Sequence, residues 1–133
     1  MSSGSPDWSL LGAIFAGGVV GALLRAALEK AVPVQAGAWP WSIFLINVGG
    51  AAALGYFVTR LQERLPPTTY RRPFLGTGFC GALTTFSTLQ VEVVSLEKDG
   101  HVLMAAGYMV ASITVGLLAV TGAMLITRRA RLA

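Results

Sequence analysis

Residues 76–89 read Gly-Thr-Gly-Phe-Cys-Gly-Ala-Leu-Thr-Thr-Phe-Ser-Thr-Leu, and this stretch decides the fold. Its three glycines and its run of hydroxyl side chains interrupt what is otherwise an apolar segment long enough to cross a membrane. A bilayer has no water to satisfy open backbone groups, so a segment that invites helix breakage at membrane depth must line a cavity or bind something. The stretch therefore predicts an ion site.

The composition around this stretch is that of an integral membrane protein. The chain has 133 residues, of which 54% are hydrophobic and only 12% charged, and its mean hydropathy is +0.67. A soluble domain carries about 25% charged residues. The polar N-terminal residues have no basic segment typical of a signal peptide, so the first apolar stretch is expected to remain as a span.

Four stretches are long enough to cross the hydrocarbon core, which takes roughly 20 apolar residues each. They are residues 10–28, 41–59, 74–95 and 102–126. The prediction is an all-α membrane protein with four transmembrane helices, the third of them broken, in a single domain over residues 1–133.

The net charge of +4 comes from basic residues at the ends of the spans, which argues against a nucleic-acid partner. With four crossings, Lys30 and Lys98 lie on one side of the membrane. Seven arginines share the other side: Arg60, Arg64, Arg71, Arg72, Arg128, Arg129 and Arg131. The positive-inside rule then predicts that both termini face the cytoplasm.

Several polar residues within the spans have both a structural and a functional interpretation. Arg25 is either a snorkelling anchor or a charge facing a polar vestibule. Asn47 is either an interhelical hydrogen-bond partner or a donor facing a pore. Glu92 is either a mouth residue or an ordinary carboxylate near a helix end. Tyr108 and Ser112 lie on one helix face, which alone is weak evidence for a pathway.

Other chemistry finds little support in the sequence. The only cysteine, Cys80, favours a packing role, and the only histidine, His101, has no second His or Cys at ligand spacing. No paired carboxylates, catalytic triad, phosphate loop or redox motif can be assembled. An enzyme is therefore not expected.

Three motifs together resemble the Fluc (CrcB) family of fluoride channels. They are Gly17-Gly18-Val-Val-Gly21-Ala22-Leu-Leu-Arg25, Asn47-Val-Gly49 and Gly78-Phe-Cys-Gly81-Ala-Leu-Thr84-Thr85-Phe86-Ser87-Thr88. The resemblance spans nearly the whole chain. It implies an antiparallel dimer in the inner (cytoplasmic) membrane, with a broken third helix, a central structural sodium ion and two pores through which fluoride leaves the cell passively.

The resemblance also implies roles for single residues. Gly81 and Thr84 would offer backbone carbonyls to sodium, while Asn47 and Phe86 would face a pore. The polar track would contain Thr85, Ser87, Thr88, Tyr108 and Ser112. Glu92 would lie near the pore end, and Arg25 could raise the local anion concentration. Asn47, the hydroxyl groups and aromatic ring edges suit fluoride, because a small, strongly hydrated anion needs donors in place of lost water.

The sequence departs from the family at two positions. Leu89 stands where the family commonly has a second phenylalanine, and Ala82 stands where a glycine is frequent. The first departure matters for a pore, because a phenyl edge has positive quadrupole density that can face an anion and an isobutyl group has none.

Four short helices are not expected to enclose an ion path alone, so a dimer is the expected working unit. Seven arginines that fix one orientation conflict with an antiparallel homodimer, because every copy should insert the same way. The partner is therefore either an identical subunit or a related, oppositely inserted one that supplies missing pore groups. Surrounding lipid is the other expected partner.

Two rival functions stay open. A small proton-coupled multidrug exporter also has four short helices, but it needs a membrane-embedded carboxylate, and Glu29 and Glu92 both lie near helix ends. A structural subunit would use its Gly-rich helices only for assembly. That role leaves the hydroxyl cluster of residues 84–88 unexplained.

Overall fold

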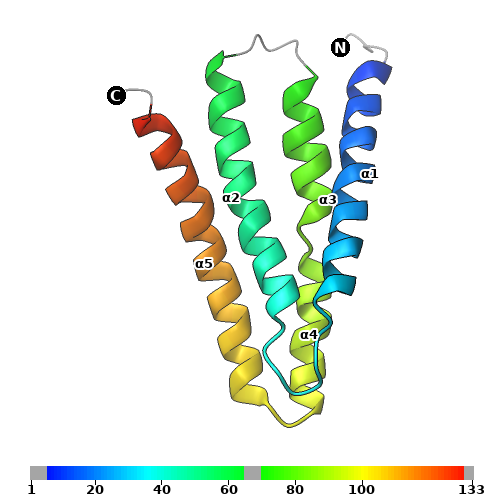
Figure 1. Cartoon of the computed structure of the whole chain (residues 1–133), viewed down its shortest axis with the longest axis vertical. Helices are drawn as coiled ribbons and strands as arrows, with labels where there is room; N and C mark the ends of the chain where they lie inside the picture. The colour runs from blue at the N-terminus through cyan, green and yellow to red at the C-terminus, as the bar shows by residue number, and fades with distance from the viewer. Residues whose placement is uncertain (1–5, 65–69, 131–133) are drawn as a thin grey trace, which may run out of the picture.

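The computed structural model describes residues 6–64 and 70–130, without the side chains of residues 63 and 64. Its helices are α1 (Trp8–Ala31), α2 (Trp41–Arg64), the π-helix η1 (Pro73–Cys80), α3 (Gly81–Leu83), α4 (Phe86–Lys98) and α5 (Val102–Arg129). The segments η1, α3 and α4 follow one another along a single crossing, the third (Figure 1).

The prediction of four membrane-spanning helices is confirmed. Four helical stretches are long and apolar enough to cross a bilayer: Trp8–Ala31, Trp41–Gln62, Pro73–Lys98 and Val102–Arg129. Each contains one of the predicted spans, so the chain is a multi-pass membrane protein. The third stretch is bent, as its glycines and hydroxyl residues predict.

Local sequence signals set where the helices begin. Asp7 caps α1, since its Oδ1 accepts hydrogen bonds from the amides of Ser9 (3.0 Å) and Leu10 (3.1 Å). Two glycines have positive φ angles, +73° at Gly37 between α1 and α2 and +83° at Gly100 between α4 and α5. Only glycine adopts this conformation without strain, so the tight connections depend on these two residues.

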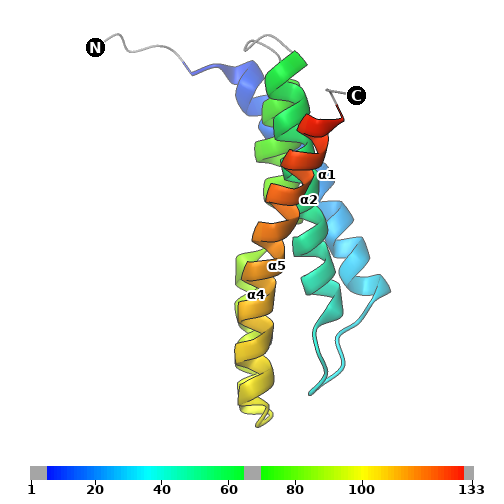
Figure 2. The same cartoon turned by 90° about the vertical axis from the view of Figure 1, so that its left-hand side faces the viewer.

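The helices form two closely packed pairs. α2 packs mainly against α5, and α1 packs mainly against η1. Seen from the side, the lower ends of α4 and α5 run together, while those of α1 and α2 lie apart from them (Figure 2). The described parts of both chain ends lie at the same end of the molecule (Figure 1).

The arginines that the sequence predicts on one side of the membrane lie at one end of the molecule where the structure describes them. Arg60, Arg71, Arg72, Arg128 and Arg129 lie at helix ends on the side of the two termini, whereas Lys30 and Lys98 lie at the opposite end. Arg64 is the last residue of α2, and Arg131 lies outside the described residues. The cytoplasmic orientation stays a prediction.

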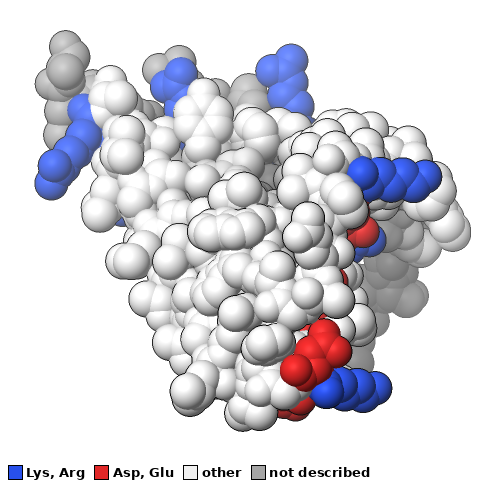
Figure 3. Space-filling view, turned by 60° about the horizontal axis from the view of Figure 1, so that its bottom comes forward, with Lys and Arg blue, Asp and Glu red and all other residues white. Residues whose placement is uncertain are grey.

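The surface suits a lipid environment. Large apolar side chains are exposed on α1 and α5, among them Phe15 (74%) and Leu103 (90%). In the space-filling view the middle of the visible face has no charged side chains, and the charges gather at its margins (Figure 3). The buried apolar cluster is small and joins α2, α4 and α5 through Ile43, Leu89, Val93, Leu96, Ala105 and Tyr108.

Glycines allow α1 and η1 to touch backbone to backbone. A Cβ added at Gly17 would collide with the carbonyl of Phe74, one at Gly21 with the carbonyl of Phe79, and one at Gly78 with the carbonyl of Ile14. Small residues at helix contacts allow such close approach in lipid, where there is no hydrophobic force between helices. This glycine seam (Gly17, Gly21 and Gly78) holds the first half of the third crossing against α1.

We expect Gly17→Val to weaken the fold, because the added methyl groups force α1 away from the backbone of η1. The expected loss is about 1–3 kcal/mol, the usual effect of overpacking. Thermal unfolding of the purified protein in detergent measures it. Gly12→Val is the matched control on α1, since nothing lies within 4 Å of a Cβ at Gly12. Equal melting temperatures for the two variants would contradict the seam.

Candidate functional site

The third crossing is broken at Thr84 and Thr85. Thr84 has φ −78° and ψ 150°, and Thr85 has φ −145° and ψ 121°, so both are extended between α3 and α4. Gly81 is still helical, with φ −62° and ψ −36°. The interruption predicted within residues 76–89 therefore falls at residues 84 and 85. The helix continues through Gly81 and ends only at Thr84, because Asn47 binds the extended backbone of Thr85 and not that of Gly81.

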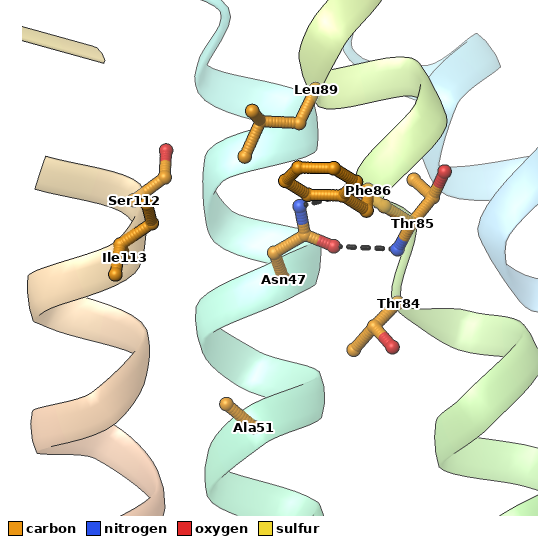
Figure 4. Close-up of a pocket in the computed structure, with 8 residues that line it drawn as sticks. All are labelled: Asn47, Ala51, Thr84, Thr85, Phe86, Leu89, Ser112 and Ile113. Atoms are coloured by element: carbon orange, nitrogen blue, oxygen red, sulfur yellow. Dashed lines mark hydrogen bonds between the residues drawn. The ribbon is translucent and has the colours of Figure 1, made fainter. Parts of the chain in front are cut away.

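Asn47 of α2 pairs with both backbone groups of Thr85. Its Oδ1 accepts a hydrogen bond from the Thr85 amide (2.8 Å), and its Nδ2 donates to the Thr85 carbonyl (3.0 Å). Figure 4 shows the amide facing this backbone. Like the backbone of a neighbouring β-strand, the Asn47 side chain both accepts and donates a hydrogen bond. It thereby satisfies the amide and the carbonyl of Thr85, which the broken helix leaves without partners. These contacts are the interhelical hydrogen bonds of the structural interpretation, and the pore role of Asn47 stays a prediction.

Hydroxyl groups form hydrogen bonds at both of the helix ends that meet at the break. The Thr85 Oγ1 accepts a hydrogen bond from the Thr88 amide (3.2 Å) and donates to the Thr88 Oγ1 (3.1 Å). It also lies 3.2 Å from the Ser87 Oγ. Thr85 therefore caps the N-terminus of α4, the role that threonine favours there. The Thr84 Oγ1 instead donates back to the Cys80 carbonyl (3.0 Å).

The break leaves carbonyl oxygens without backbone partners. The Thr84 amide donates to the Cys80 carbonyl (3.1 Å), and the Thr85 amide is taken by Asn47. No hydrogen bond within the described part of the chain ends on the carbonyl of Gly81 or Thr84. Open carbonyls at membrane depth can coordinate a cation, since no water is present to satisfy them.

A pocket of about 280 Å³ lies beside the break (Figure 4). It brings together six residues that the sequence selected: Asn47, Thr84, Thr85, Phe86, Leu89 and Ser112. Ala51 and Ile113 complete the lining, and no sequence signal marks them because they are ordinary apolar helix residues. None of the lining residues carries a charge.

Gly50 sets the distance between this pocket's two sides. A Cβ at Gly50 would collide with the Thr84 methyl group. The glycine therefore lets the extended segment lie directly against α2, within reach of Asn47 one turn away.

Phe86 and Leu89 occupy very different positions in the pocket. Phe86 is 64% exposed at its rim, whereas Leu89 is only 4% exposed and belongs to the buried cluster with Tyr108. Leu89, the expected departure from the family, therefore lies inside the packed core. Phe86 is the aromatic ring that the pocket presents at the surface of the single chain.

The remaining predicted residues lie around the pocket. Ser87 and Thr88 belong to the cap of α4. Tyr108 and Ser112 are buried on the same face of α5, as predicted, and neither hydroxyl has a hydrogen-bond partner in the described residues. The Arg25 Nε lies 3.8 Å from a Glu29 carboxylate oxygen. Glu92 lines a different pocket, of about 270 Å³, with Ser95 and Asp99. The structure does not bring Arg25 or Glu92 to the break.

Comparison with known proteins identifies relatives over most of the chain. The family described as "CrcB-like protein, Camphor Resistance (CrcB)" matches residues 12–124. A protein of Mycobacterium bovis named fluoride-specific ion channel FluC 1 is 56% identical over 126 residues, which are 95% of this chain and 96% of that protein. Another FluC 1, from Mycolicibacterium paratuberculosis, is 53% identical over 94% of this chain and 95% of its own. FluC 2 of Thermobifida fusca is 38% identical over 88% of this chain and 87% of its own.

We expect Asn47→Leu to destabilise the break strongly, because the Thr85 amide and carbonyl would both lose their partner in an apolar site. Each unsatisfied group costs about 1–3 kcal/mol. Asn47→Asp should have an intermediate effect, since it keeps an acceptor for the amide and loses the donor. Thermal unfolding in detergent measures the loss, and hydrogen exchange at the Thr85 amide locates it. Gln90→Leu, at an exposed amide on α4, is the control. Unchanged exchange at Thr85 in Asn47→Leu would refute the clamp.

Proposed function

This chain belongs to the CrcB family of fluoride-specific ion channels, and we propose that it lets fluoride leave the cell passively across the inner (cytoplasmic) membrane. The family is one of channels, not of enzymes, which agrees with the lack of catalytic motifs in the sequence. The observation that carries the proposal is the uncharged pocket at the break in the third crossing, with Asn47 and Phe86 on its walls.

The pocket offers donors and ring edges suited to a small anion. Asn47 uses one N–H of its Nδ2 on the Thr85 carbonyl, which leaves its second N–H for an ion. Phe86 presents an exposed ring whose edge has positive quadrupole density. The Ser112 hydroxyl, buried and without a partner among the described residues, lines the same pocket. In this proposal these groups replace the water that fluoride loses on entering the membrane.

A second part of the proposal concerns a structural sodium ion. The open carbonyls of Gly81 and Thr84 fit a hard cation, because they are neutral oxygen ligands in a site without water. A hard cation takes several oxygen ligands, more than these two. A second subunit would therefore contribute the rest. Bound sodium would supply a fixed positive charge at the break.

The position of Phe86 at the rim of the pocket supports the proposed dimer. A ring that is 64% exposed on a single chain lies on an open rim, and a second subunit would close it. In the proposed antiparallel dimer two such pockets give two pores. Arg25 and Glu92, which lie away from the break, would then act at the pore mouths.

The identity of the second subunit is part of the proposal. The five described arginines at one end favour a single orientation. A related, oppositely inserted partner would resolve the conflict with antiparallel pairing. Relatives named FluC 2 and FluC 3 both occur in Streptomyces avermitilis, so one organism can hold two such proteins.

The rival functions have less support. A proton-coupled exporter requires a carboxylate at the substrate site, and the pocket at the break is lined by uncharged residues. A purely structural subunit would not require the open carbonyls and the orphaned hydroxyl groups beside it.

We expect liposomes containing the purified protein, with its partner if one is needed, to release fluoride and retain chloride. Phe86→Leu should slow fluoride release at least about tenfold, because the variant keeps apolar volume and loses the ring edge. Phe15→Leu is the control, since Phe15 on α1 is also largely exposed (74%) but does not line the pocket at the break. Release of chloride as fast as fluoride would refute the proposed function.

Orientation is tested with cysteines at opposite ends of the molecule. Arg60→Cys and Lys98→Cys, each in a Cys80→Ala background and coexpressed, can be joined by a short bismaleimide only if two copies insert in opposite senses. If the partner is compulsory, the chain expressed alone should give no such cross-link and no fluoride release. A conducting, cross-linked pair of identical subunits would exclude a compulsory partner.

A further inference from the structure

Trp39 is an aromatic residue at the mouth of the fold whose polar atom has no partner. It lies just before α2, and its ring contacts Trp41, Phe44 and Tyr108 at centroid distances of 5.9, 5.8 and 5.4 Å. Its Nε1 is buried and makes no hydrogen bond within the described residues. A tryptophan at a bilayer interface normally directs this N–H to water or headgroups. Trp41, which is 56% exposed, suits that ordinary role, and Trp39 does not.

The orphaned polar atoms of the chain are not scattered. In the described residues five buried side-chain atoms lack a hydrogen-bond partner: Glu29 Oε1, which forms the ion pair with Arg25, Trp39 Nε1, Thr59 Oγ1, Tyr108 Oη and Ser112 Oγ. Three of them belong to residues in one continuous row. The Trp39 ring meets the Tyr108 ring edge-on at 88°, Tyr108 and Ser112 are one turn apart on α5, and Ser112 lines the pocket at the break. A buried polar group without a partner indicates a missing water or ion.

Leu89 lies beside this row. Leu89 and Tyr108 belong to the same buried cluster, and Trp39 packs against that cluster. An isobutyl group at Leu89 offers no positive edge to an anion, whereas an indole N–H is a stronger donor than any ring edge. The indole has no acceptor, so it can stabilise an anion and cannot coordinate a cation.

We propose that the indole N–H of Trp39 is a further fluoride-binding donor, beside the apolar Leu89, which offers none. It serves the mouth end of the route, beyond Tyr108 and Ser112. The inference rests on the proposed function, since it assigns a new residue to the same ion path. It requires the Trp39 side chain to turn its N–H toward the ion when fluoride arrives.

Conduction gives the first test. Trp39→Phe keeps an aromatic ring and removes only the donor, and it should slow fluoride release from liposomes at least about tenfold, as expected for the loss of one hydrogen bond to an ion. Trp41→Phe is the matched control and should keep the original rate. Adding Leu89→Phe to Trp39→Phe should recover most of the rate, which a merely structural role of Trp39 would not produce. Full-rate release by Trp39→Phe would overturn the inference.

Indole NMR provides a test independent of conduction. The chain has three tryptophans, so ¹⁵N-labelled protein gives three indole N–H signals, and Trp39→Phe identifies the relevant one. Sodium fluoride should shift the Trp39 signal and leave Trp8 and Trp41 in place, while sodium chloride should shift none. An unmoved Trp39 signal in protein that releases fluoride would refute the inference and leave the proposed function intact. A wild-type protein that releases no fluoride would instead remove the proposed function.

Discussion

The pairing of Asn47 with the backbone of Thr85 is the interaction on which the rest of the structure depends. A helix broken inside a bilayer exposes amides and carbonyls that lipid cannot satisfy. One side chain on α2 supplies both an acceptor and a donor at 2.8 and 3.0 Å, and Gly50 lets the extended segment come close enough to receive them. The break is thereby fixed at one place and joined to the neighbouring crossing. In the described residues the carbonyls of Gly81 and Thr84 are among those at the break that receive no hydrogen bond.

The first half of the broken crossing is held by a different device. Gly17, Gly21 and Gly78 bring α1 and η1 into backbone contact, so η1 is positioned by close packing rather than by side-chain hydrogen bonds. The second half, α4, is held by the apolar cluster around Leu89 and Tyr108. The two halves of one crossing therefore pack against different helices, η1 against α1 and α4 against α5. The break lies where these two packing units meet.

The chemistry of the site follows from its lack of charge. A carboxylate or a lysine in the pocket would bind one ion too firmly or repel it, whereas amide, hydroxyl and ring-edge dipoles can replace water without trapping the ion. The full charges lie instead at the helix ends, where Arg60, Arg128 and Lys98 meet the headgroup region. In the proposed channel this separation would leave selectivity to short-range donors. The charges that predict the orientation lie away from the pocket at the break.

Much of this architecture was predictable from the sequence, because the bilayer imposes simple rules on length and polarity. Apolar lengths were enough for four crossings, the stretch of residues 76–89 was enough for a broken third one, and three motifs together were enough for the family. The position of the break within residues 81–85 was not predictable, since it depends on where Asn47, far away in the chain, reaches a backbone amide. The burial of Leu89 and of the Trp39 N–H was equally invisible. The order of residues alone determined which segments enter the membrane. Packing between helices decided which polar groups are satisfied and which are left for the proposed ion. The reason is that a hydrogen bond requires two groups, and only the folded chain brings them together.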